Sequence, residues 1–249
     1  MDADEYRRMA AAGATHWWYQ STRALLTQLL EPGLSAITGR IPLVLDAGGG
    51  TGATGGWMTR HATTVLADFE DMALVVARDD HVDAPHQLVP VRADLNRLPF
   101  DANVFDIVLC VTALCHRMNP DPAAIVSDMA RITRPGGVVC LMEPGVRRLW
   151  RGHDEVTHTA RRFSVGDMRS MAIGAGLEVV RATGAYSFLV PAAAVLSLVE
   201  RGAAKSDVGR NESGLGGAFG ALARGERRLL RHIDIPFGLS AIVLARKPS

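Results

Sequence analysis

Cysteine is scarce in this sequence. The 249 residues include three cysteines, Cys110, Cys115 and Cys140, and each lies inside an apolar stretch. An odd number of cysteines argues against a disulfide framework, and no pair of them has the spacing of a zinc site. We therefore expect reduced cysteines in a hydrophobic core and no metal centre.

Long apolar runs are also missing. The longest one near the C-terminus, residues 188–199, is interrupted by Pro191 and Ser197. It is shorter than the roughly 20 residues that span a bilayer. The first residues are acidic and no long apolar run follows them, which does not fit a secretory signal or a transit peptide. We expect a cytoplasmic protein without a transmembrane segment.

Neither sign of charge dominates the chain, whose net charge is +1. The distribution is uneven, because residues 1–146 hold 11 basic and 17 acidic side chains and residues 147–249 hold 16 and 9. The basic part could face an anionic substrate, make a peripheral membrane contact, or simply form a solvated arginine-rich surface. Its arginines are scattered and lack interleaved aromatics, so we expect no nucleic-acid partner.

What the sequence does contain is a regular alternation. Short runs rich in Val, Ile and Leu alternate with helix-length segments, which is typical of βαβ units around a mainly parallel sheet. The predicted strands are residues 42–47, 64–68, 88–91, 105–111, 138–143, 177–183 and 238–246. The predicted helices between them are residues 55–61, 71–78, 122–133 and 165–175, the last with Ser164 as its N-cap. We expect one α/β domain over residues 41–249.

The N-terminal segment, residues 1–40, is expected to lie outside the sheet. It should be helical, since Trp17, Trp18, Tyr19 and four leucines offer apolar faces at helical spacing. Two interpretations stay open, namely packing against the sheet edge and a helical lid over a bound ligand.

A second segment outside the sheet is residues 186–234, which we interpret as a helical cap inserted before the last strand. It contains two helix-like stretches, around residues 192–203 and 215–231. The first is apolar enough to line a hydrophobic substrate pocket or the interface of a homodimer, although core packing in a monomer explains it equally well.

The strongest motif is a glycine-rich turn at residues 45–52, Leu-Asp-Ala-Gly-Gly-Gly-Thr-Gly, where an apolar strand gives way to a helix. Glycine suits this place because a side chain would keep the backbone from touching a ligand that lies across the strand ends. The start of the following helix favours a carboxylate or a phosphate.

Taken alone, the turn leaves two cofactors open. Gly48, Gly50 and Ala53 also satisfy the dinucleotide-binding pattern, and Asp68 lies at the offset of a ribose ligand, so a nicotinamide-dependent oxidoreductase stays an alternative. Asp46, directly before the glycines, argues for the other choice. A carboxylate there would repel a pyrophosphate but attract the ammonium group of an amino-acid cofactor.

Several segments together resemble the class I S-adenosylmethionine-dependent methyltransferases. Residues 46–52 resemble motif I of that family, Asp68-Phe69 its ribose-binding position, and residues 92–100 its adenine-binding segment. Residues 16–19, His-Trp-Trp-Tyr, and residues 153–163, His-Asp-x-x-x-His-x-x-Arg-Arg-Phe, resemble a bacterial branch of it. The resemblance implies a Rossmann-like fold of seven mostly parallel strands, with an antiparallel last strand and helices on both faces.

The resemblance also implies a cofactor, S-adenosylmethionine, with S-adenosylhomocysteine as the product. Asp46 would help to hold the amino group, Asp68 would bind both ribose hydroxyls, and Asp94 would accept from the adenine amino group. The full set that it implies is Asp46, Ala47, Gly48, Gly50, Gly52, Asp68, Phe69, Asp94, Leu95, Val111 and His116. For the acceptor, a small molecule, we expect contacts with Trp18, Tyr19, Asp154 and Arg162.

Methyl transfer needs a base only if the acceptor arrives protonated, and histidine is the natural candidate near neutral pH. His116 follows the fourth strand and either borders the cofactor or takes this role. His153 and His158 lie after the fifth strand, where Asp154 could orient one of them, or the cluster could merely form salt bridges. His153 and His158 are five residues apart and do not share a helix face, so metal binding would need a distant ligand such as His232.

Three functions remain open from the sequence. The first is methyl transfer from S-adenosylmethionine to an O or N atom of a small molecule, such as a secondary metabolite. The second is nicotinamide-dependent oxidoreduction, against which the segment 92–100 argues. The third is a non-catalytic partner subunit that binds S-adenosylmethionine without turnover.

Overall fold

A computed structural model describes residues 12–13, 15–150, 152–199 and 216–249 of the chain. Its core is one seven-stranded sheet in the order β3-β2-β1-β4-β5-β7-β6. The strands are β1 (Leu43–Ala47), β2 (Thr63–Asp68), β3 (Leu88–Arg92), β4 (Phe105–Val111), β5 (Thr133–Pro144), β6 (Glu178–Ala185) and β7 (Ser240–Arg246). β1 to β5 pair in parallel, and β7 runs antiparallel to both β5 and β6. The predicted fold class is therefore confirmed.

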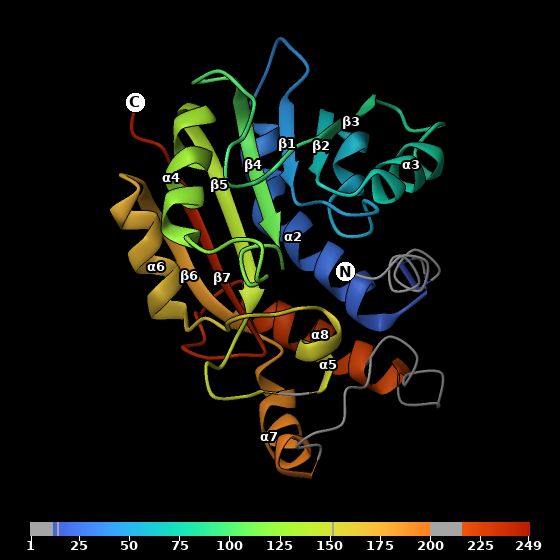
Figure 1. Ribbon diagram of the computed structural model, residues 1–249, viewed down its shortest axis with the longest axis vertical. Coiled ribbons are helices and arrows are strands. Elements are labelled where there is room, and N and C mark those ends of the chain that lie inside the picture. Colours follow the sequence, from blue (N-terminus) through green and yellow to red (C-terminus); the bar gives the residue numbers. More distant parts are fainter. Residues whose placement is uncertain (1–11, 14, 151, 200–215) are drawn as a thin grey trace.

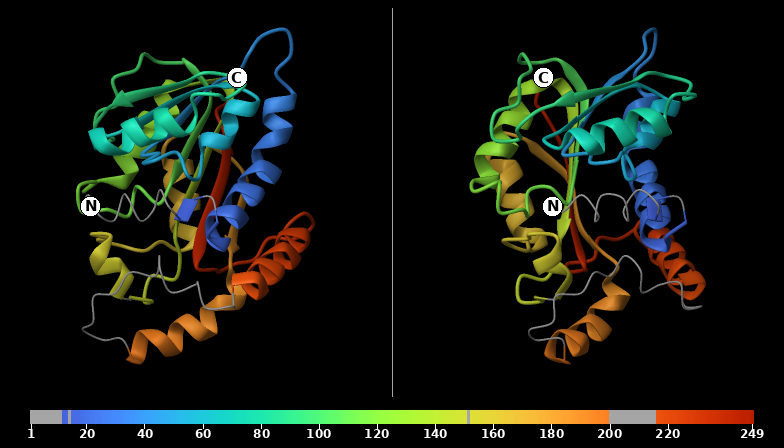
Figure 2. Two further views of the ribbon diagram at one scale, coloured as in Figure 1. Left: turned by 90° about the vertical axis from the view of Figure 1, so that its right-hand side faces the viewer. Right: turned by 45° about the vertical axis from the view of Figure 1, so that its right-hand side comes forward.

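Helices cover both faces of the sheet (Figure 1). One face carries α4 (Pro122–Ile132) and α6 (Val165–Gly174), and the other carries α2 (Trp17–Ser35), α3 (Asp71–Asp80) and α8 (Gly216–Leu229). α2 and α8 lie side by side across the sheet, while α7 (Val190–Val199) lies beyond the strand ends (Figure 2). The central strand β4 is buried along its whole length, as expected of a strand covered on both faces.

Some local predictions need correction. The predicted helix at residues 55–61 is a 3-10 helix, η1 (Gly56–Arg60), because the glycine-rich approach to it disfavours a regular helix. A one-turn helix, α5 (Gly152–Val156), was not predicted in the polar segment after β5. The first cap helix spans Val190–Val199, and its predicted end at residue 203 lies outside the described residues. The predicted helical start of the chain, residues 1–11, also lies outside them.

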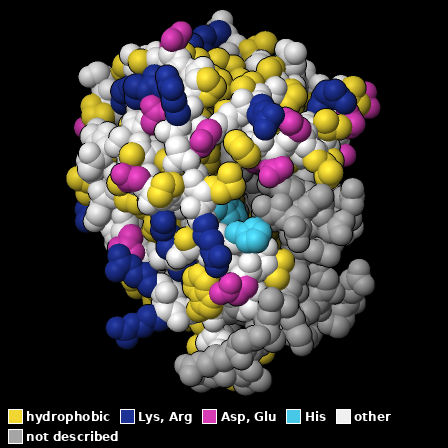
Figure 3. All heavy atoms as spheres, viewed as in Figure 1, with side chains coloured by type: hydrophobic (Ala, Val, Ile, Leu, Met, Phe, Trp, Pro, Cys, Tyr) yellow, Lys and Arg dark blue, Asp and Glu magenta, His cyan; other side chains and the backbone are white. Residues whose placement is uncertain are grey.

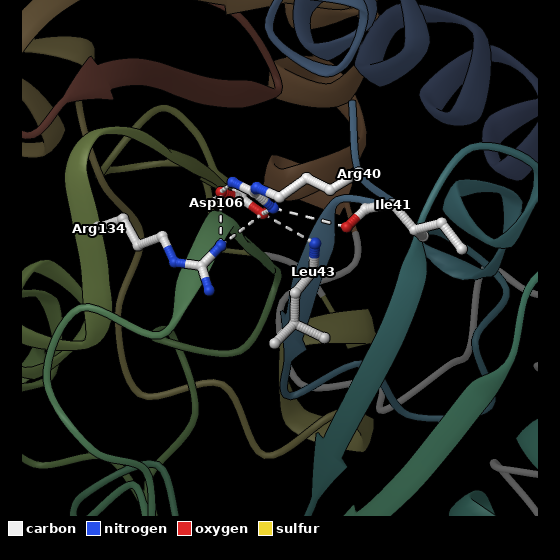
Figure 4. A network of polar contacts seen from close by, with 5 residues as sticks. All are labelled: Arg40, Ile41, Leu43, Asp106 and Arg134. Atoms are coloured by element: carbon white, nitrogen blue, oxygen red, sulfur yellow. Dashed lines mark hydrogen bonds and ion pairs between the residues drawn. The ribbon is translucent and has the colours of Figure 1, made fainter. Parts of the chain in front are cut away.

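The amino edge of the sheet is held by one buried carboxylate, at the opposite strand ends from the glycine turn. Asp106 binds the guanidinium groups of Arg40 and Arg134, and it accepts a hydrogen bond of 2.9 Å from the backbone nitrogen of Leu43 (Figure 4). Burial opposes ionisation, but the bonds from Arg40, Leu43 and Arg134 outweigh it and lower the pKa of Asp106. This network fixes the starts of β1, β4 and β5 relative to each other.

Candidate active site

A cavity of about 740 Å³ opens at the carboxyl ends of the strands. It is walled by the turns after β1, β2, β3 and β4, by the segment that follows β5, and by the start of α2 with parts of α7 and α8. Its volume lies in the upper part of the usual range for small-molecule sites, about 300–1,000 Å³. Histidine side chains lie near the centre of one face of the molecule, with Lys and Arg side chains gathered beside them (Figure 3).

The turn after β1 brings bare backbone to the cavity. Gly48 and Gly50 have positive φ angles of 73° and 55°, which glycine adopts without strain. A Cβ on Gly48 would lie 2.6 Å from the Cβ of Ala113, so the turns after β1 and β4 can approach only because this side chain is missing. No atom of the described residues lies within 4 Å of where a Cβ of Gly50 would stand. The backbone of Gly50 is therefore open to a ligand.

Asp68 ends β2 and lines the cavity next to this turn. One carboxylate oxygen accepts a hydrogen bond of 2.8 Å from the nitrogen of Gly50, and the other accepts one of 3.0 Å from the nitrogen of Glu70. Each oxygen keeps further acceptor capacity for a pair of hydroxyls. The next residue, Phe69, exposes 45% of its surface at the cavity wall, under the guanidinium of Arg92 at 5.4 Å.

Asp94 and Leu95 follow β3 on the same side of the cavity. The carboxylate of Asp94 accepts hydrogen bonds from the backbone nitrogen of Asn96, at 2.9 Å, and from its side-chain amide, at 2.7 Å. Leu95 is buried and packs in the core below. The predicted residues Gly48, Gly50, Asp68, Phe69, Asp94, Leu95, Val111 and His116 thus all line one cavity.

Asp46 lies elsewhere, and its predicted contact with the cofactor needs correction. The Asp46 side chain is fully buried beneath the turn, against Gly49 and Gly55, and does not line the cavity. The predicted residues Ala47 and Gly52 do not line the cavity either. Neither carboxylate oxygen of Asp46 has a hydrogen-bond partner in the part of the chain that the structure describes. Burial, together with the charge of Asp68, raises the pKa of Asp46 to about 7. Asp46 can act on a cationic ligand through the field of its charge, not through contact.

The buried state of Asp46 predicts a pH dependence of stability. Because the folded pKa is raised, the folded chain keeps a proton that the unfolded chain loses, so the free energy of unfolding should fall as pH rises from about 4 to about 7. Asp46→Asn removes this titration and should reduce that fall by about 2 kcal/mol. Urea unfolding at pH 5 and pH 8 measures it, with the exposed Asp83→Asn as the control. Equal pH slopes for wild type and Asp46→Asn would contradict the assignment.

Glu143, at the end of β5, was not predicted from the sequence. Its side chain is fully buried and accepts three backbone hydrogen bonds, from Ala113 at 3.0 Å, Leu114 at 2.9 Å and Cys115 at 3.1 Å. Burial raises the pKa of Glu143 to about 7 although these bonds oppose it. The carboxylate shapes the turn after β4, which forms the cavity wall that ends in His116. A carboxylate at a strand end was a signal of such a role.

The three predicted histidines occupy different places. His116 lines the cavity, and burial lowers its pKa, so its imidazole is neutral near pH 7. His158 also lines the cavity but is exposed, in a left-handed conformation with φ of 52°. The backbone of His153 lies in α5. His116 thus combines a half-buried position in the cavity wall with a neutral ring.

The salt-bridge interpretation of the cluster after β5 fits the structure better than an orienting carboxylate. Arg162 binds both oxygens of Asp154, with the closest contact at 2.9 Å, and both side chains are almost fully buried. Arg162 also donates to the carbonyl oxygen of Gly145, and the guanidinium of Arg161 donates to that of Asn119. The pair closes the cavity as a neutral unit.

The side of the cavity away from Asp68 is aromatic. The predicted residues Trp18 and Tyr19 line it, although Tyr19 is 4% exposed and packs largely in the core. The sequence did not predict Tyr186 and Phe219, whose rings lie 5.7 Å and 5.5 Å from that of Trp17. These residues come from segments far apart in the chain, and the fold brings them together.

Residues 44–137 match the family described as methyltransferase domain. The matched range runs from β1 through β5 and contains the turns that hold Gly48, Asp68 and Asp94. The order of the seven strands and the antiparallel β7 agree with the fold that the sequence resemblance implies. The chain has the fold of the class I methyltransferases.

Individual relatives agree with this class I fold. A ubiquinone/menaquinone biosynthesis C-methyltransferase of Idiomarina loihiensis is 36% identical over 106 residues, which are 40% of this chain and 41% of the relative. The chain thus matches less than half of that relative's length. Phosphoethanolamine N-methyltransferase 2 of Haemonchus contortus, solved with S-adenosyl-L-methionine, has a TM-score of 0.60 at 16% identity, over 92% of this chain and 53% of that one. The [4+2]-cyclase SpnF has a TM-score of 0.58 at 18% identity, over 89% and 80%.

The cavity of this class I fold suits S-adenosylmethionine, the cofactor that the fold implies. The open backbone of Gly50, the acceptor oxygens of Asp68 and the exposed face of Phe69 lie along one wall. Asp68 and Asp94 line this wall and Asp46 lies behind it, which suits a ligand with a positive sulfonium and a positive ammonium group. Gly48, Gly50, Asp68, Phe69, Asp94 and Leu95 are the residues that would hold it.

Within residues 12–13, 15–150, 152–199 and 216–249, no three His, Cys, Asp or Glu side chains come together in a way that could hold a metal ion. Among the same residues, no helix has the length and hydropathy needed to cross a membrane.

Proposed function

We propose that the chain is an S-adenosylmethionine-dependent methyltransferase that methylates an O or N atom of a small molecule. The observation that carries this proposal is one cavity shared by two unlike walls. One wall presents Gly50, Asp68 and Phe69 for the cofactor, and the other presents an aromatic surface with a neutral histidine, His116, between them. When bound, the cofactor supplies an electrophilic methyl group on a sulfonium.

The chain's own residues would position the acceptor and exclude water. Holding two reactants in line lowers a barrier by up to about 7–11 kcal/mol, which makes a rigid wall more important than any single group. Glu143 fixes the turn that carries His116, and the buried pair of Arg162 and Asp154 closes the side after β5. The start of α2 and the segment 186–234 supply the aromatic side, in line with a lid and a cap.

The direct test is calorimetry followed by transfer. Titration of the purified chain with S-adenosylmethionine and with S-adenosylhomocysteine should give micromolar or tighter binding of both. Incubation with a methyl-labelled cofactor and a cell extract should then label a small molecule. Binding without labelling would favour the non-catalytic subunit, and binding of a nicotinamide nucleotide in place of both compounds would favour the oxidoreductase.

His116 is proposed as the base that takes the acceptor's proton. Its neutral imidazole is needed, so kcat/KM should rise as pH increases through its lowered pKa, below 6.5, and level off near pH 7. His116→Gln should lower kcat about 100-fold and remove this inflection. A methyl-transfer assay from pH 5 to pH 8 measures both.

The exposed His232→Gln serves as the matched control and should keep the wild-type profile. His158→Gln tests the other cavity histidine. If the inflection survives in His116→Gln and disappears in His158→Gln, the base is His158.

A further inference from the structure

The indole nitrogen of Trp17 is a buried hydrogen-bond donor without a partner among the described residues. Trp17 is the first residue of α2 and lines the cavity, where its ring meets Tyr186 edge-on, at 5.7 Å and 89°, and Phe219 at 5.5 Å. An unsatisfied buried donor destabilises a fold and is rare in native proteins. Trp57 carries a second such nitrogen, but it does not line the cavity. Trp17 lines the cavity while its nitrogen is buried in the wall, so a small rotation of the ring would bring the N–H to a ligand.

The wall around Trp17 is mainly apolar, although the imidazole of His16 also lines the cavity, with its ring centroid 6.0 Å from that of Trp17. The wall includes Trp18 and Tyr186, together with Leu189, Ala193 and Phe219 from the segment after β6. The hydroxyl of Tyr186 is already engaged with that of Thr22, at 2.8 Å. Flat apolar surface with few polar groups is typical of sites for aromatic or other flat hydrophobic ligands.

The charged side chains on this side of the cavity neutralise one another. Arg162 is paired with Asp154 at 2.9 Å, and Arg117 is paired with Glu155 at 3.3 Å. Among the described residues, the carboxylates that line the cavity without an ion pair are Asp68, Glu70 and Asp94, and they lie on the cofactor side. A charged ligand next to Trp17 would lose its hydration without gaining an opposite charge from the described residues, which costs several kcal/mol.

We propose that this side of the cavity binds an uncharged, flat, apolar molecule bearing a carbonyl or hydroxyl oxygen, and that the Trp17 indole N–H donates a hydrogen bond to that oxygen. The role of this molecule as the methyl acceptor rests on the proposed function. The binding itself does not. Trp17 is then a specificity residue, since a ligand without the oxygen leaves its N–H unsatisfied.

Three naphthalene probes separate the parts of this proposal. 2-Acetylnaphthalene has the carbonyl oxygen, 2-ethylnaphthalene has nearly the same shape without it, and 2-naphthoate carries a negative charge. Calorimetry with S-adenosylhomocysteine present should show the acetyl probe binding about tenfold tighter than the ethyl probe, and 2-naphthoate binding weakest. The wild-type protein alone tests the proposed class of ligand. Three results would each overturn it: equal affinities of the two neutral probes, no binding of either, or tighter binding of 2-naphthoate.

Trp17→Phe assigns the effect to the indole nitrogen. The ratio of the two neutral affinities should fall from about ten to about one, through weaker binding of the acetyl probe only. Trp57→Phe is the matched control, since it removes the other unpartnered indole nitrogen outside the cavity, and it should keep the ratio. An unchanged ratio in Trp17→Phe would overturn the role of Trp17.

The outcome is separable from that of the proposed function. Absence of S-adenosylmethionine binding would refute methyl transfer, and the probe ratio, repeated without S-adenosylhomocysteine, would still report on Trp17. Conversely, a normal cofactor isotherm with a probe ratio of one would refute only the acceptor class.

Discussion

Asp68→Ala is expected to weaken the binding of S-adenosylmethionine about 1,000-fold. Two hydrogen bonds from ligand hydroxyls to a carboxylate contribute about 2 kcal/mol each, and about 4 kcal/mol corresponds to three powers of ten in affinity. The same substitution removes the acceptor for the nitrogens of Gly50 and Glu70, which loosens the turn that the ligand contacts. Titration calorimetry of the wild-type protein and of Asp68→Ala measures the loss of affinity.

Asp71→Ala is the matched control for Asp68. Asp71 starts α3 three residues later, is exposed, and forms a surface ion pair with Arg92 at 3.2 Å. Exposed pairs of this kind contribute little, so its cofactor affinity should stay within about twofold of wild type. An Asp68→Ala protein that binds as tightly as Asp71→Ala would refute the cofactor site.

Glu143→Ala is expected to lower the free energy of unfolding by about 3–5 kcal/mol. It leaves three buried backbone N–H groups, those of Ala113, Leu114 and Cys115, without an acceptor, and each such group costs about 1–3 kcal/mol before water enters the space. Glu143→Gln keeps one acceptor oxygen and should lose about half as much. Urea unfolding at pH 7 gives both values.

The exposed carboxylate of Glu178, at the start of β6, provides the control for this strand-end position. Glu178→Ala should change stability by less than about 0.5 kcal/mol. If Glu143→Ala is as stable as Glu178→Ala, the carboxylate does not support the cavity wall.

The sheet could be predicted because each of its strands corresponds to a short apolar run in the local sequence. β4 is an apolar run at residues 105–111, interrupted by Asp106, and it is buried along its whole length because the sheet is covered on both faces there. β5 starts earlier than predicted, at Thr133, because Thr133 pairs with Phe105 across a bulge that no local pattern reveals. The cavity-lining residues Gly48, Asp68 and Asp94 were predictable for the same reason, as each lies at or just after the end of a strand.

The rest of the site depends on contacts between distant segments. The partners of Glu143 lie about 30 residues before it, and the rings around Trp17 come from positions 186 and 219. Asp46 was assigned to the cofactor because a carboxylate beside the glycines would attract its ammonium group, but the side chain is buried below the turn. Side-chain direction at a sharp turn follows from backbone angles that the sequence does not specify.

The position of β7 between β5 and β6 has a consequence for how the protein matures on the ribosome. β1 to β5 can pair as they emerge, so the Asp68 wall has its neighbours early. β6 has no partner in the sheet until residues 240–246 are synthesised, and Leu239 and Ser240 are themselves part of the cavity wall. A nascent chain stalled before β7 would therefore hold half of a binding site, with β5 as an open edge that invites aggregation.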